Sequence, residues 1–195
     1  MATTKKPAVP QRIYQLHVAL LDITPMIWRR LWIPGNLKLS KLDRVIQEAF
    51  GWTNSHLHEF RITGERYGMT EIESIDGDED LKGDKKFTVS KVLKDSVKEF
   101  EYEYDFGDGW RHRVVVEGIM AETHYNDWPL CLTGENACPP EDIGGPGGFG
   151  DFVRSMAVAD PEDEDHFENW NWHGGPFDPK GFDVNSTNAR IRRLR

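Results

Sequence analysis

Cysteine is scarce in this sequence, which has only two, Cys131 and Cys138, among 195 residues. Two cysteines are too few for the disulfide framework that holds small secreted domains together. No apolar run approaches the roughly 20 residues that cross a bilayer as a helix, and the first residues lack the apolar segment of a signal peptide. We therefore expect a cytoplasmic protein that makes no membrane contact and keeps both thiols reduced.

Positive charge is also in short supply. The chain has 24 Lys and Arg against 33 Asp and Glu, which gives a net charge of −9 at pH 7. A field of that sign repels phosphate backbones, so the charge argues against a broad nucleic-acid-binding surface. We expect the partner to be a protein or a small molecule, and the composition does not identify it.

Several catalytic signatures are missing. The chain has no P-loop lysine after a glycine, no His-Glu-x-x-His zinc motif and no serine nucleophile elbow. Gly145, Gly147 and Gly150 do satisfy the G-x-G-x-x-G spacing, but PPEDI precedes them instead of the strand that a dinucleotide-binding fold requires. We interpret these glycines as a sharp turn that leads into a helix near Asp151.

The patterns that are present predict an α+β fold. Period-2 runs indicate two hairpins and a further strand, and apolar residues at helical spacing indicate several helices. Within the helix at 40–51, Ser40 is the expected N-cap, Asp43 completes a capping-box variant and Gly51 ends the helix. The expected strands are 13–21, 27–33, 56–64, 99–106 and 110–118, and the expected helices are 40–51, 88–95, 151–159, 161–169 and one that Asn185 caps.

We therefore predict a single α+β domain over 12–195, with a mostly antiparallel sheet built from hairpins and packed against a few helices. Residues 1–11 are expected to form a disordered leader. Residues 121–149 show no periodicity, so we expect a long loop that lies over one end of the sheet, and such loops are often functional.

The stretch YEYDFGDGWRH (102–112) indicates a hairpin whose register has two candidates. A two-residue Asp-Gly loop would pair Asp105 with His112. A three-residue loop, 107–109, would pair Tyr104 with His112 and Asp105 with Arg111. We favour the second register, because it makes one face aromatic and the other a ladder of opposite charges, with Gly109 at positive φ. The candidate residues for a binding pocket here are Tyr104, Asp105, Asp108, Trp110 and His112.

Histidines supply the candidate metal ligands. His56 and His58 are two residues apart on an expected strand, so both imidazoles would point to one face, and His112 could complete a site for a divalent metal ion. Glu141 and Asp142 are the candidate catalytic carboxylates. Each has a plainer interpretation: the histidines as packed core residues, and the carboxylates as a solvated turn or as N-terminal charges of the next helix.

The two cysteines are separated by six residues, which is too far apart for a zinc-finger half-site. We expect inert buried thiols; a redox pair or a mixed Cys/His site is the alternative.

Taken together, the segments IWRRL, AFGW, HLHEF, YDFGDGWRH, CPPEDIGGPGGF and FDPKGFD resemble the plasmid pRiA4b ORF-3-like family of bacteria and archaea, over about residues 12–195. The resemblance implies one compact α+β domain and no particular activity. It marks the following positions for testing: His56, His58, Asp105, Asp108, Trp110, His112, Pro140, Glu141, Asp142 and Gly145.

Three functions remain open from the sequence. The first is a binding or interaction module with an aromatic-lined pocket or groove. The second is a metal-dependent hydrolase that uses His56, His58 and His112. The third is an accessory protein of plasmid or mobile-DNA recombination, which the acidic composition does not favour. The sequence does not decide whether the protein is an enzyme.

Overall fold

The computed structural model describes residues 12–70, 80–121, 129–158 and 163–194. Within these ranges, eight strands form one sheet in the order β5-β4-β3-β6-β7-β1-β2-β8, and every neighbouring pair is antiparallel except β4 and β5. The strands are β1 (Arg12–Leu20), β2 (Trp28–Pro34), β3 (His58–Ile62), β4 (Glu65–Gly68), β5 (Leu81–Gly83), β6 (Glu99–Tyr104), β7 (Trp110–Ala121) and β8 (Leu130–Glu135). The predicted α+β class with a mostly antiparallel sheet is confirmed.

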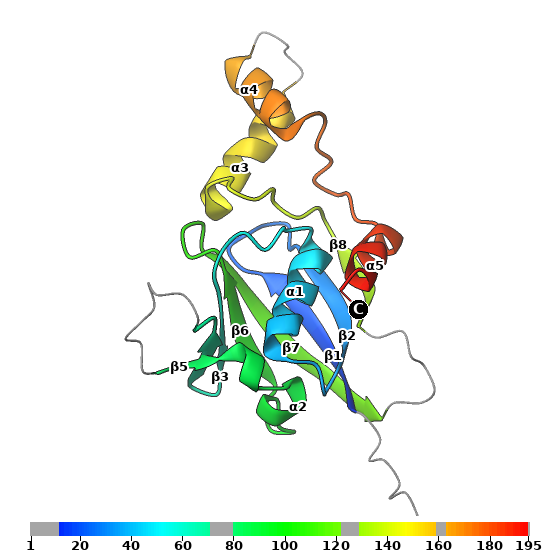
Figure 1. Cartoon of the computed structure of the whole chain (residues 1–195). Helices are drawn as coiled ribbons and strands as arrows, with labels where there is room; N and C mark the ends of the chain where they lie inside the picture. The colour runs from blue at the N-terminus through cyan, green and yellow to red at the C-terminus, as the bar shows by residue number, and fades with distance from the viewer. Residues whose placement is uncertain (1–11, 71–79, 122–128, 159–162, 195) are drawn as a thin grey trace, which may run out of the picture.

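One face of the sheet is covered by helix α1, which crosses it in Figure 1. The helices are α1 (Leu39–Phe50), α2 (Val89–Val92), α3 (Gly145–Met156), α4 (Glu164–His173) and α5 (Val184–Arg192), with a 3₁₀ turn, η2, at Asp84–Lys86. The apolar stripe of α1, which includes Leu42 and Ile46, is fully buried against inward-facing strand residues. Helix α5 lies beside α1 and β8, whereas α3 and α4 extend past one end of the sheet.

The opposite face of β6 and β7 carries charge. Arg113 pairs with Glu99 at 2.5 Å, Arg111 pairs with Asp22 at 2.6 Å, and Glu103 pairs with Arg61 of β3 at 2.8 Å. The period-2 alternation of the hairpin therefore has the predicted consequence, with aromatic residues inside and charges outside.

The register of this hairpin differs from both predictions. Tyr104 faces Trp110 and Tyr102 faces His112, so the loop has five residues, 105–109. Asp105 leaves the strand at φ 54, and its Oδ1 accepts a hydrogen bond from the backbone N–H of Gly107 at 3.0 Å. Asp105 is therefore absent from the charge ladder, contrary to the prediction, while Gly109 does have positive φ.

The predicted helix caps also need correction. Lys38, not Ser40, is the N-cap of α1, and it makes no side-chain cap bond; the helix start is held instead by a bridge between Lys38 and Thr88. Asp43 is not part of a capping box, because it is buried on the inner side of the helix. Asp183, not Asn185, caps α5. Thr88 is the N-cap of α2, although it makes no side-chain cap bond, and Gly51 ends α1 at φ 98 as predicted.

Several boundaries also move. His56 precedes β3, because the strand begins at His58. Helix α3 begins at Gly145, earlier than the predicted 151, and β8 occupies part of the segment expected to be irregular. The expected leader at 1–11 and the first part of the 121–149 loop lie outside the described residues.

Candidate functional site

Three polar side chains from separate segments meet beyond the end of β6. Nε2 of His56 lies 3.0 Å from Oδ1 of Asp142 and 3.6 Å from Oδ2 of Asp105. One ligand atom from each residue lies within 4.8 Å of the other two. An imidazole with two carboxylates is a donor set that divalent metal ions accept. We call these three residues the His56 cluster.

The backbone around the His56 cluster is unusual. Asn54, Asp105 and Asp142 have φ of 62°, 54° and 59°, the left-handed region that residues with a Cβ rarely adopt. Two of these residues belong to the cluster, and the third lies two positions before His56. Such conformations cost of order 1–3 kcal/mol each and gather at functional sites. Here they turn the Asp105 and Asp142 segments toward His56.

Glu141 connects the loops that carry the cluster. Its Oε1 accepts a hydrogen bond from the Tyr104 hydroxyl at 2.5 Å, and its Oε2 accepts bonds from the backbone N–H of Thr53 at 3.1 Å and from the Thr53 hydroxyl. The Tyr104 hydroxyl also accepts a bond from the N–H of Ser55 at 3.0 Å. Burial, with the neighbouring Glu141 carboxylate, raises the pKa of Tyr104 well above its usual value, so this phenol remains a donor. Glu141 thus orients the two segments on either side of it.

The motifs YDFGDGWRH and CPPEDIGGPGGF interlock through glycine. Gly145 has φ 70, and a Cβ there would overlap the carbonyl oxygen of Asp108. Oδ2 of Asp108 accepts a bond from the N–H of Gly144 at 3.2 Å, and a Cβ at Gly148 would overlap the carbonyl of Ile143. Gly145 and Gly148 therefore serve a close backbone approach, whereas Gly147 and Gly150 of the predicted G-x-G-x-x-G set contact no backbone in this way.

Aromatic rings lie directly beneath the cluster. Trp52 stacks on Tyr104, with ring centroids 5.1 Å apart, and contacts Trp110 and His112. Its Nε1–H donates to the carbonyl of Pro139 at 3.0 Å. Tyr104, Trp110 and His112, predicted as pocket residues, are fully buried in this core. Sequence reasoning missed Trp52, although the AFGW motif contains it.

His112 lies apart from the His56 cluster. Its Nδ1–H donates to the carbonyl of Tyr102 at 3.2 Å, and its ring packs edge-on against Phe50 and Trp52. Complete burial lowers the pKa of His112 to about 3, so the ring is neutral at pH 7. This placement matches the core-histidine interpretation of the sequence.

His58 has a third, separate environment. Its Nε2 lies 3.0 Å from Oδ2 of Asp84, and its Nδ1 lies 3.2 Å from Oδ1 of Asp43. That same Asp43 oxygen accepts bonds from the Tyr102 hydroxyl at 2.7 Å and from Nε2 of Gln47 at 2.8 Å. The predicted metal set His56, His58 and His112 is thus divided among three environments. No sequence signal pointed to Asp43 or Asp84.

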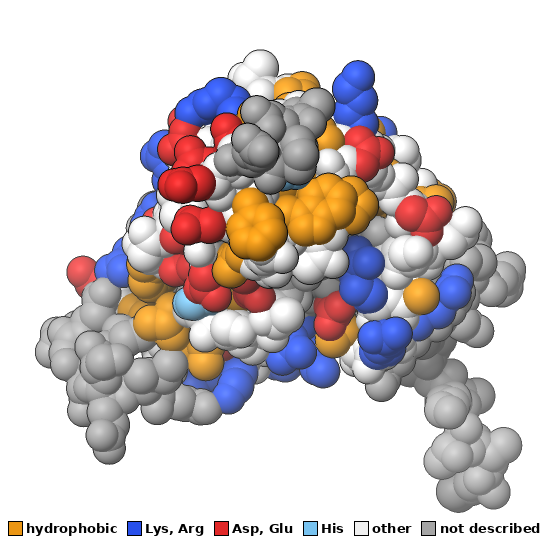
Figure 2. Space-filling model, turned by 90° about the horizontal axis from the view of Figure 1, so that it is seen from above, with side chains coloured by type: hydrophobic (Ala, Val, Ile, Leu, Met, Phe, Trp, Pro, Cys, Tyr) orange, Lys and Arg blue, Asp and Glu red, His pale blue; other side chains and the backbone are white. Residues whose placement is uncertain are grey.

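Two pockets adjoin on this side of the molecule. One, of about 480 Å³, is lined by Asn54, Ser55, His56, Leu57, Met69, Asp105, Phe106 and Gly107, so two residues of the His56 cluster belong to its wall. The other, of about 450 Å³, shares Asn54 and Met69 with the first and contains His58. Viewed from the α3–α4 end, a histidine borders acidic side chains and a hydrophobic surface (Figure 2).

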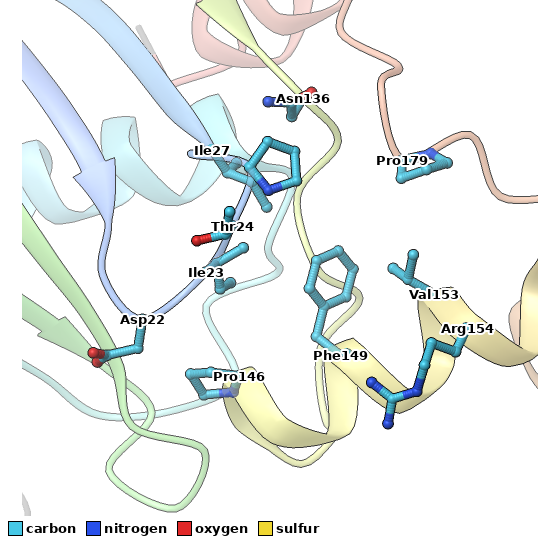
Figure 3. A pocket seen from close by; sticks show the side chains of 12 residues that line it. Asp22, Ile23, Thr24, Ile27, Asn136, Pro146, Phe149, Val153, Arg154 and Pro179 are labelled. Atoms are coloured by element: carbon cyan, nitrogen blue, oxygen red, sulfur yellow. The ribbon is translucent and has the colours of Figure 1, made fainter.

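A third pocket, of about 370 Å³, lies between the loop that joins β1 to β2 and helix α3. Phe149 of α3 reaches toward Ile23 and Thr24 of that loop, and Pro179 borders the other side (Figure 3). The lining is mostly apolar and includes one aromatic ring, Phe149, so the aromatic residues predicted to line a pocket do not line this one.

The two cysteines are free. Burial raises the pKa of the Cys131 thiol to about 11, and burial likewise raises the pKa of Cys138. Both groups are therefore protonated at pH 7, which suits unreactive thiols. Cys131 donates its backbone N–H to Oδ1 of Asn188 in α5 at 2.8 Å, so its segment holds that helix against β8.

No helix among the described residues is long and apolar enough to cross a bilayer. The chain is similar to the uncharacterized protein y4hQ of Sinorhizobium fredii, with 39% identity over 162 residues that cover 83% of this chain and 81% of the relative. It also resembles the crystal structure of a protein of unknown function, MM3350 from Methanosarcina mazei Go1. That likeness has a TM-score of 0.79 and 33% identity, and it covers 91% of this chain and 98% of the other.

Most segments that carried the resemblance noted in the sequence lie at or near the His56 cluster; the exceptions are IWRRL, at the start of β2, and FDPKGFD, just before α5. A family model described as plasmid pRiA4b ORF-3-like protein matches residues 12–186. Because this match covers nearly the whole chain and the fold agrees, the protein belongs to the plasmid pRiA4b ORF-3-like family.

Proposed function

We propose that this protein is a small-molecule-binding domain whose pocket holds a divalent metal ion through His56, Asp105 and Asp142. The observation that carries the proposal is the convergence of three ligand atoms within 4.8 Å at the wall of a 480 Å³ pocket. The pocket volume is within the range of about 300–1,000 Å³ that small-molecule sites occupy. The proposal combines the binding module and the metal site that the sequence left as alternatives.

The electrostatics of the site support a cation. Nε2 of His56 is buried and has no hydrogen bond of good geometry among the described residues, although two carboxylates lie near it. A metal ion would give this nitrogen a partner and would offset the repulsion between Asp105 and Asp142. One imidazole with two carboxylates suits Zn²⁺, Mn²⁺ or Fe²⁺ better than the all-oxygen shell that Ca²⁺ prefers.

A metal-dependent hydrolase is the second candidate function, because the His56 cluster offers three protein ligands, the number found in catalytic zinc sites. Three protein ligands leave coordination positions open for a water molecule and a substrate group, as in catalytic zinc sites. In this version Asp142 is a ligand, and Glu141 is held by Tyr104 and Thr53 beside it. Glu141 is therefore a positioning residue in this structure, and a catalytic role for it would require one of those bonds to open.

Isothermal titration with Mn²⁺ and Zn²⁺ tests the proposal. We expect one site per chain in the wild type and at least tenfold weaker binding in His56→Ala and Asp142→Asn, because each substitution removes one of three ligands. His17→Ala is the matched control, since His17 lies on β1, stacked against Trp28 and outside the cluster. Equal metal affinity in His56→Ala and wild type, with both folded, would contradict the proposal.

A further inference from the structure

The 450 Å³ pocket next to the metal site has an unusual arrangement of charge. Its buried lining includes Asp43, His58 and Asp84, with 2%, 4% and 2% of their surface exposed. Its outer lining includes four cationic side chains, of which Lys41, Lys85 and Arg193 are exposed and Arg44 is half-buried. We call this cavity the charged pocket.

The inner part of the charged pocket is negative. Two carboxylates flank one imidazole, so the net charge of the three groups is negative while both carboxylates are ionised, even when His58 is protonated. Burial raises the pKa of Asp43, and the nearby His58 ring and the hydrogen bonds from the Tyr102 hydroxyl and Gln47 Nε2 oppose that shift. The ion-pair partner that Asp43 and Asp84 share is the His58 imidazole. His58 offsets at most one of the two buried carboxylates, and a buried charge without a counter-ion is costly, so this environment favours one further cationic group.

The outer part of the charged pocket carries cationic side chains that lack a carboxylate partner in the described part of the chain. Most arginines of the described chain are paired with carboxylates, including Arg30, Arg61, Arg66, Arg111 and Arg113. Lys41, Arg44 and Arg193 form no ion pair with a described carboxylate, although the chain carries nine more acidic than basic residues. Three cations at one opening are therefore available to an anionic group.

We propose that the charged pocket binds a small zwitterion of the amino-acid class, with its ammonium group facing Asp43 and Asp84 and its carboxylate facing Lys41, Arg44 and Arg193. Met69 and Leu194 also line the pocket and offer apolar surface to an aliphatic side chain. A simple anion would bring its charge toward two buried carboxylates. A simple amine would leave the outer cations without a partner. A zwitterion satisfies both.

L-Leucine is a suitable first probe because of the apolar lining, with the other standard amino acids tested singly beside it. NMR titrations use the full chain in EDTA, so that the result does not depend on a metal at the His56 cluster. We expect at least one amino acid to saturate shifts of residues around the pocket at millimolar concentration. 4-Methylpentanoate is leucine without its amino group, and 3-methylbutylamine is leucine without its carboxylate. If leucine binds, each of these analogues is expected to bind at least tenfold more weakly. No binding by any standard amino acid, or binding of either analogue as tight as that of leucine, overturns the proposal.

Variants separate the two ends of the pocket. Arg44→Gln and Lys41→Gln are expected to weaken amino-acid binding by about tenfold, equivalent to about 1.4 kcal/mol, while Lys94→Gln, at an exposed position outside the pocket, leaves it unchanged. Asp84→Asn is expected to weaken binding of both the amino acid and the amine. Because Asp84 is buried, that variant is compared only if it folds; the two outer variants keep the test decisive. Wild-type affinity in both outer variants would overturn the proposal.

Discussion

The hydroxyl of Tyr104 donates a 2.5 Å hydrogen bond to Glu141, and through this bond the hairpin β6–β7 holds the loop that carries Asp142. The same hydroxyl accepts the N–H of Ser55, next to His56. One phenol therefore contacts two of the segments that supply the His56 cluster.

Tyr104→Phe removes both bonds and leaves Glu141 and the Ser55 N–H without that partner. We expect a loss of about 1.5–3 kcal/mol in the free energy of unfolding, the usual contribution of a hydrogen bond to a charged group, together with weaker metal binding. Urea denaturation and calorimetric titration measure the two effects. Tyr67→Phe is the control, because the buried Tyr67 packs its ring on Phe87 without a hydroxyl bond among the described residues. Equal losses in the two variants would contradict the prediction.

Gly145→Ala tests the interlocking of the two motifs. The added Cβ would overlap the carbonyl of Asp108 at a positive-φ position, so we expect a loss of at least about 2 kcal/mol in stability. Gly147→Ala is the matched control in the same helix, where a Cβ meets nothing within 4 Å; it should be neutral or stabilise by about 0.5–1 kcal/mol. Thermal unfolding of both proteins compares them. Similar melting temperatures of the two variants would contradict the prediction, because they would show that the loops carrying Asp108 and Gly145 can move apart without a loss of stability.

His112 predicts a pH dependence of stability. Its pKa is about 3 in the folded protein and about 6.5 when the chain is unfolded. Between these values the unfolded chain binds a proton that the folded protein does not, so the contribution is complete above pH 6.5 and is lost as the pH falls toward 3. The expected slope is up to about 1.4 kcal/mol per pH unit. His112→Phe should reduce the slope of stability against pH in this window. If the free energy of unfolding of wild type and of His112→Phe changes with pH at the same slope across this window, the result would argue against a neutral buried histidine.

Duplex DNA provides a test of the plasmid or mobile-DNA role. The net charge of −9 opposes the phosphate backbone, so we expect no binding of a fluorescent duplex at physiological salt in an anisotropy titration. Binding that weakens steeply as salt increases would instead reveal a local basic surface and revive that role.

The regular elements could be predicted because their signals are local. Apolar spacing of 3.6 residues located α1, and alternation with period 2 located β1, β2, β6 and β7, within a few residues. The hairpin register could not be predicted from alternation, because a shift by two residues keeps the same side chains on the same face. The five-residue turn depends on the bonds of the Asp105 carboxylate and on contact between Asp108 and Gly145.

Local motifs were enough to predict the fold class, the family and most residues of the site, since His56, Asp105, Glu141 and Asp142 were all singled out from them. How these residues group depends on contacts between distant segments, which the folded chain alone shows. The sequence pattern grouped His56, His58 and His112 as one ligand set. In the structure His56 lies beside a carboxylate pair, His58 lies between two buried aspartates, and His112 lies in an aromatic core. The carboxylate partners come from segments far apart in the chain, and no local pattern encodes which distant segments will meet.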